Sequence, residues 1–346
     1  MVLQGQPCGR VGRCRGFEGP LARVGLQLFR ARGAALPDRG SIVRAMKHAS
    51  LLVFLGILLA AGGARAQQPD FSKVEIKTTK LTESIYMLEG SGGNIGVSVG
   101  EDGVIVIDDQ YAPLTGKIQE AISKLSQKPI RFVINTHWHG DHVGGNENLA
   151  SVGSVIIAHE NVRKRMSTEQ FIQLMNRKVE PSPAKALPIV TFTSDITLHF
   201  NGEDIHVVHV DPTHTDGDSI IIFPKSKIVH MGDTYMTISY PFADISSGGN
   251  FDGFIATSDK VVGMSDATTK IIPGHGPLSS KADLKAWRDM LVELRAAVKK
   301  LADAGKSLDA IKQAKPTAKW DDKWGGKFIK GDQVVEFAFA AIKGKH

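Results

Sequence analysis

Short runs of apolar residues, separated by glycines and acidic residues, characterise the chain from about residue 71 onward. The runs are rich in valine and isoleucine, which favour strands, and the residues between them are typical of turns. Two runs, at 104–108 and 228–233, each end in an aspartate, and this echo favours two packed sheets with helices outside. We expect strands at Val74–Thr79, Ser84–Leu88, Ile95–Val99, Val104–Ile107, Ile130–Asn135, Val155–Ala158, Ile205–Val210, Ser219–Phe223 and Ile228–Met231.

Three segments show helical spacing of their apolar positions instead. They are 114–125, 163–175 and 284–301, and a Pro-rich stretch at 180–188 is expected to be a connector. We interpret 284–301 as an amphipathic helix that covers a sheet, with a dimer seam as the alternative. The pattern therefore predicts one α/β domain.

The N-terminal apolar pattern is of a different kind. A charged start at Met46 precedes an apolar run at 51–60 and the small residues of Ala64-Arg65-Ala66. This order predicts a secretory signal peptide over 46–66, and its apolar run is too short to span a bilayer. A buried N-terminal helix or a membrane anchor is the alternative.

Residues 1–45 lie upstream of this signal peptide, are rich in Arg and Gly, and show no clear periodicity. We interpret Met46 as the true start of translation, which makes 1–45 a misassigned extension. A disordered arm or a transit peptide is the alternative. The mature chain is then 67–346, and we expect it in the periplasm or secreted.

Removing the leader changes the charge of the chain. The full sequence has a net charge of +6, but ten of its 42 Lys and Arg and two of its 36 Asp and Glu lie in 1–66. The remaining 32 basic and 34 acidic residues give a net charge of −2, which offers no basis for nucleic-acid binding. Both cysteines, Cys8 and Cys14, also lie in the leader, so we expect no disulfide and no thiolate ligand.

Four metal-competent side chains lie within six residues directly after the strand expected at 130–135. His137 and His139 are two residues apart on an extended segment, so both can face one ion. Asp141 and His142 follow where the chain turns into a helix, so they face a neighbouring position. Imidazole and carboxylate at this density suit zinc.

Three single residues complete the candidate site. His214, Asp233 and His275 each follow an apolar strand, in the loops PTHTDGD, GD and PGHG. Ligands on such strand-end loops can converge, because the strands supply a rigid frame.

These motifs resemble those of the metallo-β-lactamase superfamily. The resemblance extends over roughly 74–301 and rests on Asp108 at a strand end, HWHGDH, HTDGDS, GD and PGHG. It implies that 67–346 form a single αββα four-layer sandwich of the α/β class, with a dinuclear site at one edge.

The resemblance also implies a role for each site residue. One metal would take His137, His139 and His214, and the other would take Asp141, His142 and His275. Asp233 would bridge the two, and Asp108 would brace the first loop from behind the ligands. We expect two Zn²⁺ per chain, although iron or manganese would also suit a site without sulfur.

A charge count favours hydrolysis at such a site. Two Zn²⁺ with Asp141, Asp233 and a bridging hydroxide leave about one positive charge, which favours a developing oxyanion. A zinc-bound water can ionise near neutral pH, so no Ser or Cys nucleophile is required. Asp141 is the candidate catalytic residue, since it could orient this water and take its proton.

We therefore expect an exported metal-dependent hydrolase, in which metal-bound hydroxide attacks the carbonyl of a small cyclic amide, ester or thioester. A class B-like β-lactamase, a lactonase and a glyoxalase II-like thioesterase are the alternatives within this class. A non-catalytic metal-binding accessory protein and a redox di-iron centre are the alternatives from other classes. No stable membrane insertion is expected after processing. The sequence does not specify the oligomeric state.

The residue at position 236 argues against efficient hydrolysis of β-lactams. In the β-lactamases that this chain resembles, the ligand at the place of Asp233 is a cysteine, and a lysine three residues later anchors the carboxylate of the drug. Here that position is Met236. We expect small lactones or related acyl compounds to be better substrates, unless Arg163 or Lys178 reaches in as an anchor.

We predict that the exported protein begins at Gln67, because the A-x-A-like site ends at Ala66. N-terminal sequencing of secreted or periplasmic material measures this directly, and Ala66→Tyr should block the cleavage. A mature chain that retains residues 1–45 would contradict both the start site and the signal peptide.

Overall fold

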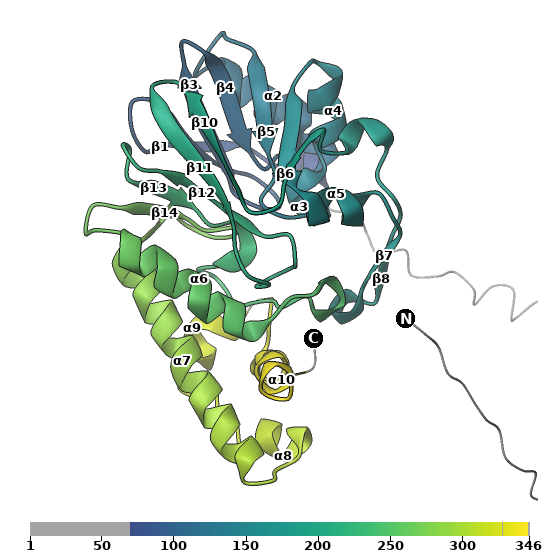
Figure 1. Cartoon of the computed structure of the whole chain (residues 1–346), viewed down its shortest axis with the longest axis vertical. Coiled ribbons are helices and arrows are strands. Elements are labelled where there is room, and N and C mark those ends of the chain that lie inside the picture. The colour runs from purple at the N-terminus through teal and green to yellow at the C-terminus, as the bar shows by residue number, and fades with distance from the viewer. Residues whose placement is uncertain (1–69, 327, 345–346) are drawn as a thin grey trace, which may run out of the picture. The chain divides into compact units, whose positions relative to one another are not determined.

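Two β-sheets face each other in the computed structural model, which describes residues 70–326 and 328–344 (Figure 1). The first sheet is antiparallel from β1 to β4 and parallel from β4 through β5 and β6 to β9. In order, its strands are β1 (Lys77–Lys80), β2 (Ile85–Glu89), β3 (Ile95–Gly100), β4 (Gly103–Ile107), β5 (Ile130–Ile134), β6 (Val155–His159) and β9 (Val190–Phe192). The second sheet holds β10 (Asp195–Phe200), β11 (Glu203–His209), β12 (Ser219–Phe223), β13 (Ile228–His230), β14 (Lys270–Ile272) and β15 (Ser279–Ser280).

Apolar side chains from the facing sides of the two sheets form the central core. The first sheet contributes Ile85, Met87, Ile105, Ile107, Ile134 and Ile157. The second contributes Ile205, Val207, Ile221, Phe223, Ile228 and Ile272. Each such side chain contributes about 1.5–3 kcal/mol when fully buried, so this layer holds the two sheets together.

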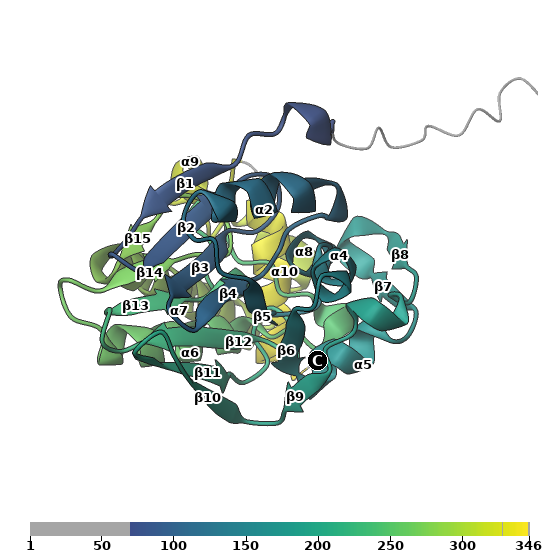
Figure 2. The same ribbon diagram turned by 90° about the horizontal axis from the view of Figure 1, so that it is seen from above.

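Helices cover the outer faces of both sheets. On the first sheet, α2 (Thr115–Ser123) packs Ile118 and Ile122 against the strands, and α4 (Asn146–Ser151) packs Leu149 (Figure 2). On the second lie α6 (Phe251–Met264) and α7 (Lys281–Asp303), with α10 (Gly331–Ile342) packed against them. The layers run helix, sheet, sheet, helix, which confirms the predicted αββα sandwich.

The helix expected at 284–301 is α7, and it begins at a capping box between Ser280 and Asp283. Its apolar stripe, which includes Trp287 and Leu291, is buried in the core outside the second sheet. The stripe therefore covers a sheet of its own chain rather than forming a seam between two copies.

The helix expected at 163–175 is wrong. The helix α5 ends at Met166 (Glu160–Met166), and a hairpin follows, made of β7 (Gln170–Ile172) and β8 (Arg177–Val179). A 3-10 turn, η3 (Gln173–Met175), joins its strands, and Asn176 after it has a positive φ of 46°, which asparagine tolerates better than most residues. Ile172 packs into the core from this hairpin, so tertiary contact decides the conformation over local spacing.

Most of the remaining elements were not predicted from the apolar pattern. The short helix α3 (Gly140–Val143) lies where the chain was expected to turn into a helix at Asp141 and His142, whereas the short helices α8 (Leu308–Gln313) and α9 (Asp321–Trp324) were not expected. The 3-10 turns are η1 (Phe71–Lys73), η2 (Ala112–Leu114), η4 (Ala184–Ala186), η5 (Gly232–Thr234) and η6 (Ile245–Ser247). The strand β14 is the apolar strand expected before His275, whereas the strands β9, β10 and β15 and the helices α6 and α10 carried no expectation.

The signal peptide predicted at 46–66 and the extension 1–45 lie outside the described residues. Within the part that is described, no helix is long and apolar enough to cross a membrane.

We predict that Trp287→Ala lowers the free energy of unfolding by about 3–5 kcal/mol, because it leaves a cavity in a packed core. Trp287 is 1% exposed, and its ring lies 5.1 Å from that of Tyr235 and 6.0 Å from that of Phe254. Val292→Ala on the same helix is the matched control, since Val292 is 39% exposed and should change stability by under about 0.5 kcal/mol. Urea unfolding of both variants measures the difference, and equal effects would contradict the prediction.

Candidate metal centre

Loops that follow strands of both sheets carry the candidate ligands. The segment after β5 carries His137 and His139, and Asp141 and His142 lie in the short helix α3 that it enters. His214 lies between β11 and β12, Asp233 lies in η5 after β13, and His275 follows β14. The structure brings all seven side chains together, and within each of three sets the ligand atoms lie within 4.8 Å of one another. The first group and the second group, described below, are joined by a third set made of His137, His142 and Asp233.

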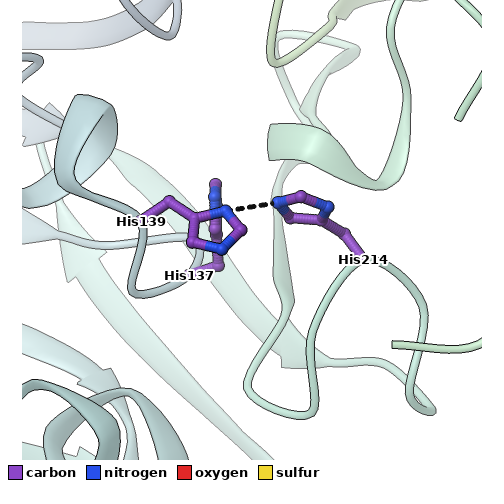
Figure 3. A group of neighbouring side chains, drawn as sticks. All are labelled: His137, His139 and His214. Atoms are coloured by element: carbon purple, nitrogen blue, oxygen red, sulfur yellow. Dashed lines mark hydrogen bonds between the residues drawn. The ribbon is translucent and has the colours of Figure 1, made fainter. Parts of the chain in front are cut away.

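The first group contains His137, His139 and His214, all of them buried. The rings of His139 and His214 point toward each other, with 2.7 Å between His139 Nδ1 and His214 Nε2 (Figure 3). The ring of His137 lies 4.9 Å from that of His139 and 4.6 Å from that of His214. Three imidazoles from two separate loops thus converge on one point.

The second group contains Asp141, His142 and His275. His275 Nε2 lies 3.4 Å from Asp141 Oδ2 and 3.3 Å from His142 Nε2. His142 is completely buried, whereas Asp141 and His275 are about a quarter exposed. This group is therefore the one that faces solvent.

Asp233 lies between the two groups. Its Oδ1 is 3.2 Å from His142 Nε2 and 3.3 Å from His275 Nε2. Its Oδ2 is 3.6 Å from His214 Nε2. The two oxygens of one carboxylate therefore face the two groups, as a bridging ligand requires.

Two buried atoms without hydrogen-bond partners also indicate that the donor set fits metal ions. His137 Nε2 and Asp233 Oδ1 are buried, and neither has a hydrogen-bond partner among the described residues. A buried polar atom without a partner costs about 1–3 kcal/mol. Cations bound by these atoms would remove that cost, and a set of imidazoles and carboxylates without sulfur suits zinc, iron or manganese.

Asp108, which was expected to brace the first loop, forms hydrogen bonds within it. It is buried and has a φ of 59°, and it accepts hydrogen bonds of 2.8 Å from both the backbone N–H and the hydroxyl of Thr136. Its Oδ2 also lies 2.7 Å from His142 Nδ1. The carboxylate thereby leaves Nε2 of His142 as the nitrogen that points into the site.

Two further braces were not found from the sequence. Asp244 Oδ2 lies 3.0 Å from His139 Nε2, and the carbonyl oxygen of Phe242 lies 2.6 Å from His214 Nδ1. Both contacts join residues far apart in the chain, and neither has a spacing signal that would reveal it. They fix the outward nitrogens of two rings of the first group.

Asp218, the second aspartate of the HTDGDS motif, shapes the loop that carries His214. Its carboxylate accepts the backbone N–H of His214 at 2.6 Å and both the N–H and the hydroxyl of Thr215, at 2.9 and 2.6 Å. Burial raises the pKa of Asp218 to about 7 despite these bonds.

Two glycines allow the close packing around the site. A Cβ at Gly93 would lie 2.1 Å from His142 Cε1, and one at Gly274 would lie 2.0 Å from Asp233 Oδ1. Asn94, beside Gly93, donates to the carbonyl oxygens of Pro273 and Gly276 at 2.9 and 2.8 Å and so fixes the PGHG loop. The turn at 91–94 therefore supports the His275 loop, and Ser91 and Gly92 line the rim of the cavity.

The electrostatics differ between the two groups. Burial lowers the pKa of His137 well below its usual value and that of His214 to about 4, so these rings favour the neutral state that binds a metal. Burial also acts on His142 and His275, but the carboxylate of Asp233 and those beside it outweigh burial. They raise the pKa of His142, and they raise that of His275 to about 10.

The two carboxylates respond in the opposite sense. Burial opposes their ionisation, but the neighbouring imidazoles outweigh it and lower the pKa of both Asp141 and Asp233. Both are therefore ionised near neutral pH and favour positive charge beside them, which a divalent cation supplies as well as a protonated ring does.

Comparisons with known proteins agree with this geometry. A family model for the metallo-beta-lactamase superfamily matches residues 88–298. The chain is 24% identical over 252 residues to the 2,4-dinitroanisole O-demethylase subunit alpha of Nocardioides sp. (strain JS1661), with 70% of each protein covered. It is 24% identical over 218 residues to a metallo-beta-lactamase type 2 of Bacteroides fragilis, with 58% of this chain and 80% of that protein covered.

A solved structure supports the fold alone. The DIM-1 metallo-beta-lactamase superposes with a TM-score of 0.52 at 18% identity, and the match covers 64% of this chain and 99% of that chain.

We predict that Asp233→Ala lowers the metal content of the purified protein from two ions per chain toward one, because both groups lose the carboxylate that they share. Elemental analysis of the dialysed protein measures the content. Asp266→Ala is the matched control, since Asp266 pairs with Lys227 on the surface and should leave both ions in place. Two tightly bound ions in the Asp233 variant would contradict the bridging role.

Proposed function

The chain belongs to the metallo-β-lactamase superfamily, and on that basis we propose that it is an exported hydrolase with two metal ions that cleaves small acyl compounds. The observation that carries this proposal is the position of Asp233, whose two carboxylate oxygens face two separate groups of ligands. Members of the superfamily are generally metal-dependent hydrolases, and the cluster could bind metal. The proposed reaction adds water across the carbonyl–heteroatom bond of a cyclic amide, an ester or a thioester.

Each side chain then has a defined task. The three histidines of the first group would hold one ion, and Asp141, His142 and His275 would hold the second. When bound, two divalent ions supply Lewis acidity that polarises a carbonyl and favours a hydroxide nucleophile near neutral pH. Zinc is the proposed metal, with iron or manganese as alternatives.

Asp141 is the proposed proton acceptor. It lines the cavity above the ligands and is about a quarter exposed, so it can contact both water and substrate. Its Oδ2 faces His275, which leaves Oδ1 as the atom that can orient the attacking water and take its proton. The lowered pKa of this carboxyl keeps it ionised near neutral pH, so it can accept a hydrogen bond from water.

The cavity favours substrates with an apolar body. It has a volume of about 340 Å³, and its walls include Trp138, Ile238, Phe242 and Phe328. Met236, which is 2% exposed, lines it at the position where the β-lactamases of the family resemblance carry a lysine. We therefore propose that lactones and related esters or thioesters are better substrates than β-lactams.

The substrates named for the two relatives differ, which makes the choice of assay important. One relative is named as a β-lactamase and the other as an O-demethylase of 2,4-dinitroanisole. The decisive measurement is kcat/KM of the zinc-loaded protein for a penicillin, a cephalosporin, a carbapenem, an acyl-homoserine lactone, an acyl-glutathione thioester and 2,4-dinitroanisole. If the protein hydrolyses none of these acyl compounds, the proposed function is wrong and a non-catalytic metal-binding protein is favoured.

We predict that Met236→Lys raises kcat/KM for the penicillin and the cephalosporin by about 10- to 150-fold. The reason is that a charge-assisted hydrogen bond to the carboxylate of the drug contributes about 1.5–3 kcal/mol. Met236→Leu is the matched control, because it keeps the apolar wall and adds no charge. Efficient turnover of all three drugs by the unmodified protein, at about 10⁶ M⁻¹s⁻¹ or above, would contradict the predicted preference.

A further inference from the structure

One side chain with a permanent positive charge lies among the apolar and polar residues that line the metal-site cavity. Arg177 is the sole lysine or arginine among the residues that line it. It comes from β8, at the start of the second strand of the hairpin that replaces the expected helix. Its neighbours in the wall are apolar, since Ile172, Met175 and Val179 of the same hairpin also line the cavity.

Strand alternation places Arg177 on the cavity side of the hairpin. Successive side chains of a strand point to opposite faces. Arg177 and Val179 both line the cavity, and Lys178 between them does not. Arg177 also pairs in register with Ile172, a buried residue of the same cavity wall.

The two neighbouring cations differ in their partners. Lys178 forms ion pairs with Glu169 and Glu180, at 2.8 and 2.9 Å. Arg177 forms no ion pair and no side-chain hydrogen bond within the described part of the chain. The guanidinium is thus exposed and free to bind an anion from the cavity.

Other contacts hold the hairpin in place. The backbone N–H of Gln173 donates to Ser246 Oγ at 3.2 Å, beside the turn that carries Asp244. Arg165 of α5 donates to Gln170 Oε1 at 3.0 Å and pairs with both oxygens of Asp216. Arg177 therefore projects from a strand that is tied to the surroundings of the metal centre.

Four other cations, two of which were expected as possible anchors, are engaged elsewhere. Arg163 donates to the carbonyl oxygen of Pro188, and Lys178 is paired as described. Lys225 donates to the carbonyl oxygen of Gly202, and Lys227 pairs with Asp266. None of these side chains lines the cavity.

We propose that Arg177 binds a carboxylate of the substrate and so selects acyl compounds that have an apolar body and an anionic end. This inference rests on the proposed hydrolase function. The guanidinium matches a carboxylate with two parallel N–H donors, a geometry that an ammonium group lacks. The apolar walls hold the body of the substrate, and its acyl group lies toward Asp141 and Asp233.

Two esters of the same acyl chain length test the proposal in the zinc-loaded protein. Mono(4-nitrophenyl) glutarate carries a terminal carboxylate, and 4-nitrophenyl pentanoate does not. Arg177→Gln should raise KM for the glutarate ester about tenfold relative to the pentanoate ester, with a smaller effect on kcat. Arg177→Lys should give an intermediate value, because a point charge remains without the second parallel donor.

Lys178→Gln is the matched control. It removes the same charge from the opposite face of the same strand, so it should leave the ratio between the two esters unchanged. An equal change in the KM ratio of the two esters in both variants would overturn the proposal. It would show that general surface charge, not contact with Arg177, sets the preference.

A binding measurement separates this proposal from the proposed function. Calorimetry with 4-phenylbutyrate and its neutral amide requires no turnover. The zinc-loaded protein should bind the carboxylate more tightly, and Arg177→Gln should reduce that preference about tenfold. A preference that Arg177→Gln leaves intact overturns the role of Arg177, whereas normal binding without hydrolysis of either ester contradicts the proposed function alone.

Discussion

The shared carboxylate of Asp233 is the constraint around which the site is built. Its two oxygens face ligands from loops of both sheets, at distances of 3.2 to 3.6 Å. The carboxylate is 7% exposed, and burial alone would disfavour its charge. Positive charge on both sides is therefore required, and the two groups of imidazoles are placed to hold it.

A shell of hydrogen bonds transmits this constraint to the fold. Asp108 fixes the outward nitrogen of His142, and Asp244 fixes that of His139. These braces come from the end of β4 and from the turn before η6, so rigid elements of both halves determine where the rings point. Hydrogen bonds of this kind hold the rings in one orientation.

The C-terminal segment contributes Phe328 to the wall of the cavity and contacts the loop at 240–242. Residues after 298 lie outside the family match, yet the N–H of Tyr240 donates to the carbonyl oxygen of Trp324 and the Tyr240 hydroxyl donates to Asp321. Phe328 packs on Phe242, with 5.7 Å between the rings, and both line the cavity. The backbone oxygen of Phe242 also contacts His214, so Phe242 links the ring of Phe328 in the cavity wall to a candidate ligand.

Local sequence patterns were enough to predict nine of the strands, and the motifs were enough to identify the seven candidate ligands, whereas the four-layer sandwich was expected from the family resemblance. Short continuous apolar runs between turn residues specify strands locally, and imidazoles and carboxylates at such close spacing have few other uses. Tertiary structure alone decided the hairpin at 170–179, the braces from Asp244 and Phe242, and the entry of Arg177 and Phe328 into the cavity. Each of these depends on contacts between residues far apart in the chain, and local spacing carries no information about which distant surface a side chain will meet.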